Sequence, residues 1–74
     1  MLTEGNNTIV KHLDGTFEEQ LGEKWTARYS EDPDTGLWII EIFNHNVAEW
    51  RSQDFASIEV AQQAAHDYYD QLIE

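Results

Sequence analysis

The chain has 74 residues, of which 41% are hydrophobic and 12% aromatic, and it contains no cysteine. A chain of this length supports one hydrophobic core, so we expect a single domain over residues 1–74, without disulfides or thiolate metal sites. Its 15 acidic and 4 basic residues give a net charge of −11, which disfavours direct binding to nucleic-acid phosphates and to anionic membranes.

Two segments come before the clearest periodic pattern. Residues 8–13 contain two β-branched apolar residues and lead into Asp14-Gly15, a dipeptide typical of turns. This segment either joins a sheet as a short strand or lies outside it. Residues 16–22 fit either a loop or one helical turn that Gly22 would end.

Three strands are predicted in the middle of the chain. The period of two typical of half-buried strands runs through residues 24–30, 37–43 and 47–52. Turn-forming residues separate these segments at 31–36 and 44–46. The side chains expected on the buried face are Trp25, Ala27, Tyr29, Trp38, Ile40, Ile42, Ala48 and Trp50.

A helix is predicted after the strands, with Ser57 as its N-cap and Glu59 in its first turn. Its buried stripe is expected to comprise Ala61, Ala64, Ala65, Tyr68 and Leu72, and the residues facing away to comprise Gln62, Gln63, Asp67 and Asp70. The alanines would let the helix lie close to the sheet. The sequence therefore predicts an α+β fold: a three-stranded antiparallel sheet packed by one C-terminal helix (β-β-β-α) with its core over residues 24–72. An N-terminal extension would add a short strand or a turn.

Three segments of this core carry a resemblance to known modules. They are Lys24-Trp25-Thr26-Ala27-Arg28, Trp50-Arg51-Ser52-Gln53-Asp54-Phe55-Ala56-Ser57 and Glu59-Val60-Ala61-Gln62-Gln63-Ala64-Ala65. In this order they resemble the sheet-plus-helix modules of AP2-type plant factors and of the N-terminal domain of phage-type tyrosine integrases. Those modules bind DNA through basic and aromatic side chains on the sheet. Here the corresponding outward positions also carry Glu41 and Glu49, so the resemblance implies the fold only.

Catalytic and metal-binding patterns are absent from the sequence. His12, His45 and His66 lack the close spacing of zinc ligands. There is no cysteine nucleophile, no glycine-rich phosphate loop and no nucleophile elbow. Adjacent carboxylates such as Glu18-Glu19 are expected to form a solvated face. We therefore predict no enzymatic activity, no metal and no cofactor.

The function that this pattern favours is protein binding. If the helix covers one face of the sheet, an apolar patch remains on the other face, formed by Leu37, Ile39 and Phe43. The N-terminal segment Ile9-Val10-Leu13 either covers this patch or leaves it exposed as an association surface. Acidic residues would steer a basic partner toward the domain: Glu31, Asp32, Asp34, Asp67 and Asp70.

Two forms of this function remain open. One is an interaction domain that binds a basic or nucleic-acid-binding protein, in its narrower form as a nucleic-acid mimic. The alternative is a structural homodimer in which the same sheet face pairs with its own copy. Residues 1–7 are expected to be flexible, and they lack the basic start of a secretory signal. The apolar run at residues 37–40 is too short to span a membrane, so we expect a cytoplasmic protein.

Overall fold

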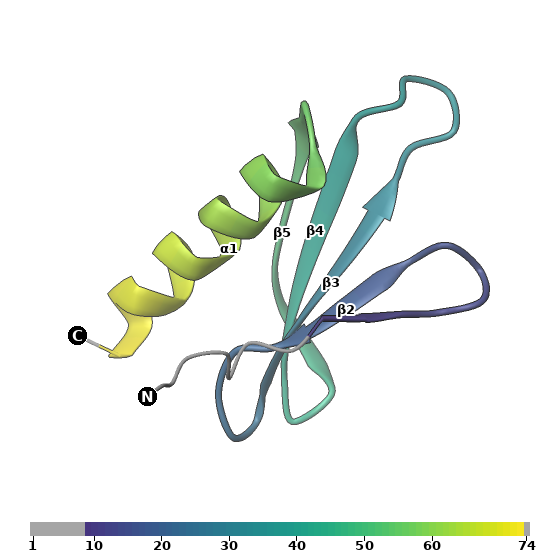
Figure 1. Cartoon of the computed structure of the whole chain (residues 1–74). Coiled ribbons are helices and arrows are strands. Elements are labelled where there is room, and N and C mark those ends of the chain that lie inside the picture. The colour runs from purple at the N-terminus through teal and green to yellow at the C-terminus, as the bar shows by residue number, and fades with distance from the viewer. Residues whose placement is uncertain (1–8, 74) are drawn as a thin grey trace, which may run out of the picture.

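The computed structural model describes residues 9–73, so the expected flexibility of residues 1–7 lies outside the described part. One antiparallel sheet of five strands and one helix make up the fold (Figure 1). The elements in chain order are β1 (Ile9–Lys11), β2 (Phe17–Gln20), β3 (Trp25–Glu31), β4 (Trp38–Asn44), β5 (Val47–Phe55) and α1 (Ile58–Ile73). Each strand pairs with the next one along the chain, so the order in the sheet is β1-β2-β3-β4-β5.

The predicted three-stranded sheet is wrong, because β1 and β2 extend it beyond β3. A tight turn joins the two added strands, in which Gly15 has a φ of 92°. Asp14 Oδ1 accepts hydrogen bonds from the Thr16 hydroxyl at 2.7 Å and from the Thr16 amide at 3.0 Å. These hydrogen bonds hold the pKa of the Asp14 carboxyl below its usual range. Residues 16–22 are therefore neither a loop nor a helical turn, since they contain β2.

The turns predicted at residues 31–36 and 44–46 are both present. The first contains Gly36 at a φ of 75°, and the amide of Asp34 donates to Asp32 Oδ1 at 2.9 Å. The second is a two-residue hairpin turn in which His45 and Asn46 have φ values of 53° and 68°. β5 continues to residue 55, beyond the predicted end at residue 52.

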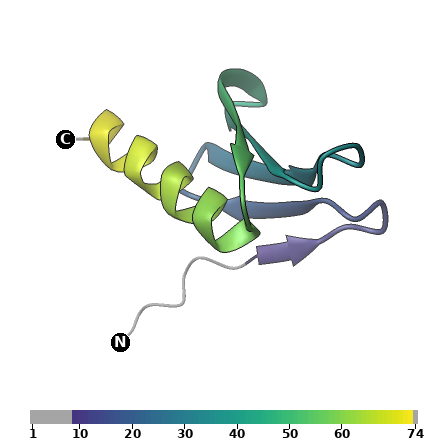
Figure 2. The ribbon, with the colours of Figure 1, turned by 90° about the horizontal axis from the view of Figure 1, so that it is seen from above.

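The helix covers one face of the sheet, which we call the inner face, and the opposite side is the outer face. Ser57 caps the helix as predicted, because its Oγ accepts a hydrogen bond from the amide of Val60 at 3.2 Å. α1 packs against β3, β4 and β5, whereas β1 and β2 lie to one side of it (Figures 1 and 2).

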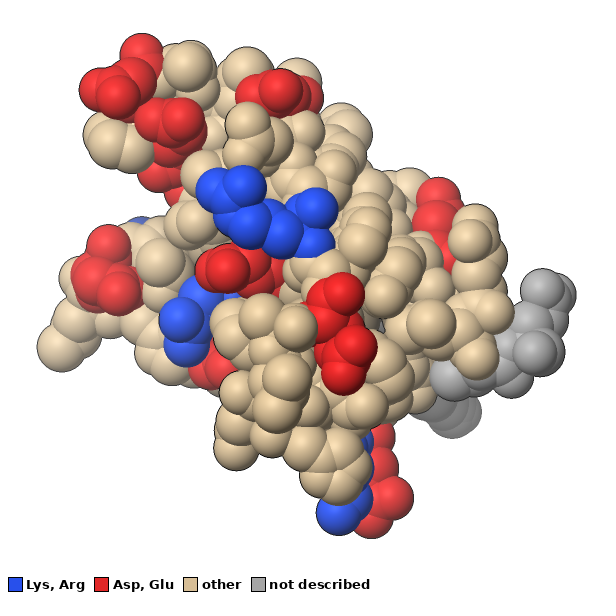
Figure 3. Space-filling model, turned by 180° about the vertical axis from the view of Figure 1, so that it is seen from behind, with Lys and Arg blue, Asp and Glu red and all other residues tan. Residues whose placement is uncertain are grey.

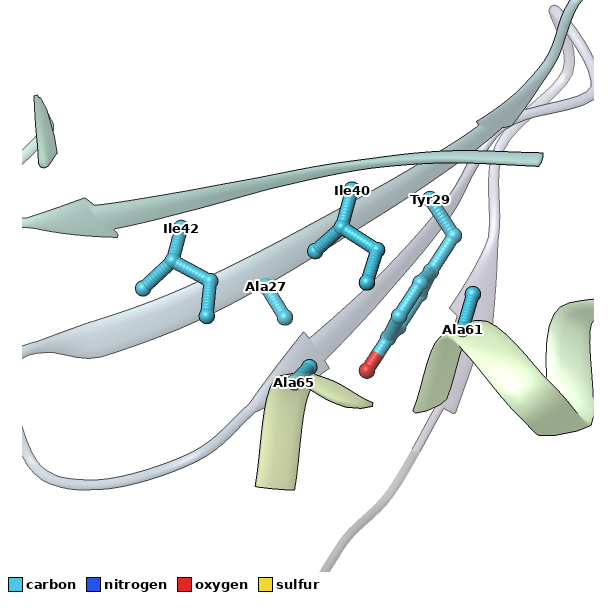
Figure 4. Close-up of a cluster of buried hydrophobic side chains, with 6 residues drawn as sticks. All are labelled: Ala27, Tyr29, Ile40, Ile42, Ala61 and Ala65. Carbon is cyan, nitrogen blue, oxygen red and sulfur yellow. The ribbon is translucent and has the colours of Figure 1, made fainter. Parts of the chain in front are cut away.

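The core lies between α1 and the inner face. Its fully buried hydrophobic residues are Ala27, Tyr29, Ile40 and Ile42 from the sheet, with Ala61 and Ala65 from the helix (Figure 4). Around this core the Trp50 ring stacks on Tyr68, with their centroids 4.3 Å apart and an interplanar angle of 8°. Leu72 departs from the predicted buried stripe, since it is 44% exposed.

Candidate functional site

The residues predicted to bind a partner do not form one surface. The apolar ones lie on β4 or just before it and are half-buried: Leu37, Ile39 and Phe43. The first group of acids lies at the end of β3 and in the turn that follows: Glu31, Asp32 and Asp34. The second group lies on α1, on the opposite side of the sheet from the outer face: Asp67 and Asp70.

The N-terminal segment does not cover the apolar patch. β1 pairs with β2 in the plane of the sheet, at its edge, instead of crossing the outer face. Val10 is 51% exposed there, and Leu13 is fully exposed in the turn after β1. No element within residues 9–73 lies over the outer face.

Charged side chains alternate in sign across the outer face. Four strands each contribute one residue, in the order Glu18, Arg28, Glu41 and Arg51, and we call this row the charge ladder. Consecutive members stand directly opposite each other in the strand register. The guanidinium of Arg28 also lies over the ring of Phe43, 5.5 Å from its centroid. Each basic side chain of the ladder therefore has an acidic neighbour.

Figure 3 shows the charged side chains on the face of the molecule that is seen from behind. Basic and acidic side chains lie next to each other across the middle of the molecule (Figure 3). At the end that carries the β3–β4 turn, acidic side chains gather without basic neighbours (Figures 1 and 3). On this face of the molecule, acidic side chains are therefore mixed with basic ones in the middle and gather at the β3–β4 turn.

A shallow, open groove of about 430 Å³ runs along the exposed side of α1 beside the end of β5. We call it the α1 groove. It is lined by Phe55, Glu59, Val60, Gln63, Ala64 and Asp67. Val60 is 50% exposed in this groove. The lining combines apolar side chains with two carboxylates and contains no basic residue.

A buried carboxylate connects β2 to the helix, which sequence reasoning missed. Glu19 is fully buried on the inner face. Its Oε1 accepts a hydrogen bond from the Tyr29 hydroxyl at 2.7 Å, and its Oε2 lies 2.9 Å from His66 Nε2. Gln62 Nε2 donates to the same Oε2 at 3.3 Å. We call these four residues the Glu19 cluster.

The expectation that Glu18-Glu19 forms a solvated face is therefore wrong, as is the expectation that Gln62 faces away from the sheet. Glu18 is half-buried and lies 2.8 Å from His12 Nε2. One signal for the cluster was present in the sequence. Tyr29 alternates onto the buried face of its strand, where a buried hydroxyl needs a hydrogen-bond partner.

The Glu19 cluster links elements and shows no arrangement for metal binding. Two of its members come from adjacent strands and two from successive turns of α1. Because the buried carboxylate has partners on both oxygens, it is stabilised in place and connects β2 to α1 through side chains. Within residues 9–73 no group of three or more His, Asp or Glu side chains is arranged to hold a metal ion.

Alkaline pH is expected to destabilise the fold through Tyr29. Burial, together with the hydrogen bond and the charge of Glu19, raises the pKa of the Tyr29 hydroxyl far above its usual range. In the unfolded chain the hydroxyl ionises at about pH 10. The stabilisation of the fold by the protonated Tyr29 hydroxyl is therefore complete below that pH and declines above it. The free energy of unfolding should fall by up to about 1.4 kcal/mol per pH unit above pH 10.

The check on this pH dependence is urea denaturation across the alkaline range, with Tyr29→Phe as the matched variant. The variant has no hydroxyl at this position but keeps Tyr68 and Tyr69. Its stability should therefore fall less steeply with rising pH. Equal slopes for the two proteins would contradict the assignment.

Comparison with known proteins identifies no relative of this chain. No protein-family model, no curated protein and no solved structure matches the chain. Among the described residues, no helix has the length and apolar character needed to cross a membrane.

Proposed function

We propose that the protein is a small acidic interaction domain that binds a basic protein partner along the α1 groove. The observation that carries this proposal is that the helix, which lines the groove, carries acidic side chains and no basic one. Residues 58–73 contain three carboxylates and no Lys or Arg: Glu59, Asp67 and Asp70. The basic residues of the chain all belong to other parts: Lys11, Lys24, Arg28 and Arg51.

The α1 groove has the chemistry to accept a segment that is apolar on one side and basic at its rim. Val60, Ala64 and Phe55 supply apolar surface for burial. Glu59 and Asp67 stand two helical turns apart, which corresponds to roughly 12 Å along the axis. The Gln63 amide between them donates to Asp67 Oδ1 at 3.0 Å. An amphipathic helix with two cations at matching spacing would satisfy both carboxylates while burying its apolar residues.

A second copy of the chain does not suit this groove. In a symmetric contact the copy would present the same carboxylates to Glu59 and Asp67, and like charges across an interface oppose binding. A partner with Lys or Arg beside apolar residues provides the opposite charge. The groove therefore favours a basic partner over self-association.

Neutralising the groove carboxylates is expected to weaken binding of a basic amphipathic peptide by about tenfold or more. The variant is Glu59→Gln/Asp67→Asn, whose side chains keep the shape and the acceptor for Gln63. The probe is a synthetic Leu/Lys helix, compared by fluorescence anisotropy with a Ser/Lys peptide of the same length and charge. The Leu/Lys peptide should bind more tightly, because only it can fill the apolar part of the groove.

The matched control is Glu23→Gln/Glu49→Gln, which removes the same two charges from exposed positions outside the groove. If both double variants weaken binding equally, net charge alone attracts the peptide and the groove is not the site. Nucleic-acid mimicry, the narrower form of this proposal, requires that duplex DNA displace a bound partner at low salt. A partner that stays bound when DNA is added would exclude mimicry and leave the interaction itself in place.

A further inference from the structure

We infer that the outer face of the sheet is a homodimer interface, in which two copies pair around a two-fold axis that runs parallel to the strands between β3 and β4. This inference is independent of the proposed function, because α1 lies on the opposite face and stays accessible in such a dimer. Three observations carry it: the outer face is uncovered, it holds apolar side chains, and its charges are self-complementary.

The uncovered outer face contains apolar residues that the fold leaves without a covering layer. Ile39 and Phe43 are half-buried on this face, and Thr26 stands directly opposite Phe43 on β3. A hollow of about 210 Å³ opens beside Phe43 and is lined by Glu18, Thr26, Arg28, Phe43 and Asn46. Sheets with an apolar face normally bury it against a second layer. Residues 9–73 supply such a layer on the inner face only.

The charge ladder identifies a second copy as the missing layer. Across the sheet its signs run negative, positive, negative, positive, from Glu18 on β2 to Arg51 on β5. Rotation by 180° about an axis between β3 and β4 reverses this order on the facing copy. Glu18 then faces Arg51 of the second copy, and Arg28 faces Glu41. Each contact occurs twice because the interface is symmetric.

The ladder also selects the direction of the axis. A two-fold axis that crosses the strands at right angles, in the plane of the interface and at the level of the ladder, would place β2 over β2 and β3 over β3. Glu18 would then face its own copy, as would Arg28, and both contacts would be repulsive. With the axis parallel to the strands, Phe43 faces Thr26 of the second copy and Ile39 faces Ser30. This arrangement pairs apolar side chains with small ones and acids with bases.

The expected dimer is weak. Four strands overlap about this axis, β2 to β5; spaced about 4.8 Å apart and about seven residues long, they give a face of roughly 450 Å² on each copy. The total of roughly 900 Å² lies in the range of weak, transient interfaces. The ladder has no net charge, so each copy still carries its full net charge of −11, and this charge also opposes association. The dimer should therefore appear only at high protein concentration.

The test uses two single variants, Glu18→Arg and Arg51→Glu, examined by sedimentation velocity over a range of concentrations. Each variant alone creates two repulsive contacts in the dimer and should weaken association by about tenfold or more. An equimolar mixture restores both attractive contacts. The Glu18 that one variant keeps faces the Arg51 that the other keeps, and the two introduced charges, which are of opposite sign, face each other. The mixture should therefore form heterodimers at concentrations where each variant is monomeric.

Two results would overturn the inference: a wild-type protein that stays monomeric up to millimolar concentration, or variants that dimerise as well alone as they do when mixed. The pair Arg28→Glu and Glu41→Arg repeats the design at the centre of the ladder. A folding defect in one variant is recognised by circular dichroism, and the other pair then decides the outcome.

Discussion

Replacing Glu19 with alanine is expected to lower the free energy of unfolding by about 3 kcal/mol or more. The substitution leaves the Tyr29 hydroxyl buried without its acceptor and removes the carboxylate that contacts His66 and Gln62. It also opens a cavity at a fully buried position between β2 and α1. A domain of this size has only about 3–5 kcal/mol of stability, so much of the variant should be unfolded at room temperature.

Urea denaturation followed by tryptophan fluorescence measures this effect, with Glu19→Gln as the control. Glutamine keeps the shape of the side chain and an acceptor for Tyr29, so its cost should be smaller, about 1–2 kcal/mol. Combining Glu19→Ala with Tyr29→Phe should cost less than the sum of the two single changes, because the double variant has no orphaned hydroxyl. Additive costs would show that the two side chains do not stabilise the fold together.

Burial of Glu19 also explains why the sequence did not predict β2. The strand consists of Phe17, Glu18, Glu19 and Gln20, and glutamate has a low preference for strands. The pattern of alternation is hidden, because the inward position after Phe17 is a carboxylate instead of an apolar residue. Its partners come from β3 and from α1, more than forty residues away for the helix. Such a tertiary contact overrides local propensity and leaves no signal within β2 itself.

The parts of the fold that were predicted correctly have strong local patterns. β3 and β4 alternate over whole strands, and Pro33 and Gly36 mark the turn between them. The N-cap at Ser57 is likewise a local feature. The candidate surfaces were harder to predict, because they depend on which strands are neighbours. The charge ladder combines one residue from each of four strands, and one of these strands, β2, was not predicted.

The remaining large effect is expected where the helix is fully buried against the sheet. Ala65→Leu should lower the free energy of unfolding by about 3 kcal/mol, because three additional carbon atoms must fit where Ala65 is fully buried against the sheet. Ala64→Leu is the matched control one position earlier on α1. Ala64 is half-buried and lines the α1 groove, so its larger replacement has space and should change stability by less than about 1 kcal/mol.

The two alanine variants also separate stability from binding. Ala64→Leu fills part of the α1 groove and should weaken binding of the Leu/Lys peptide while the fold stays intact. Ala65 lies under the helix, so loss of binding in Ala65→Leu should follow its loss of folded protein in thermal and urea denaturation. If Ala64→Leu keeps full peptide affinity, the basic segment does not lie in the groove. Equal destabilisation by both variants would mean that the helix does not present Ala65 to the sheet and Ala64 to its exposed side.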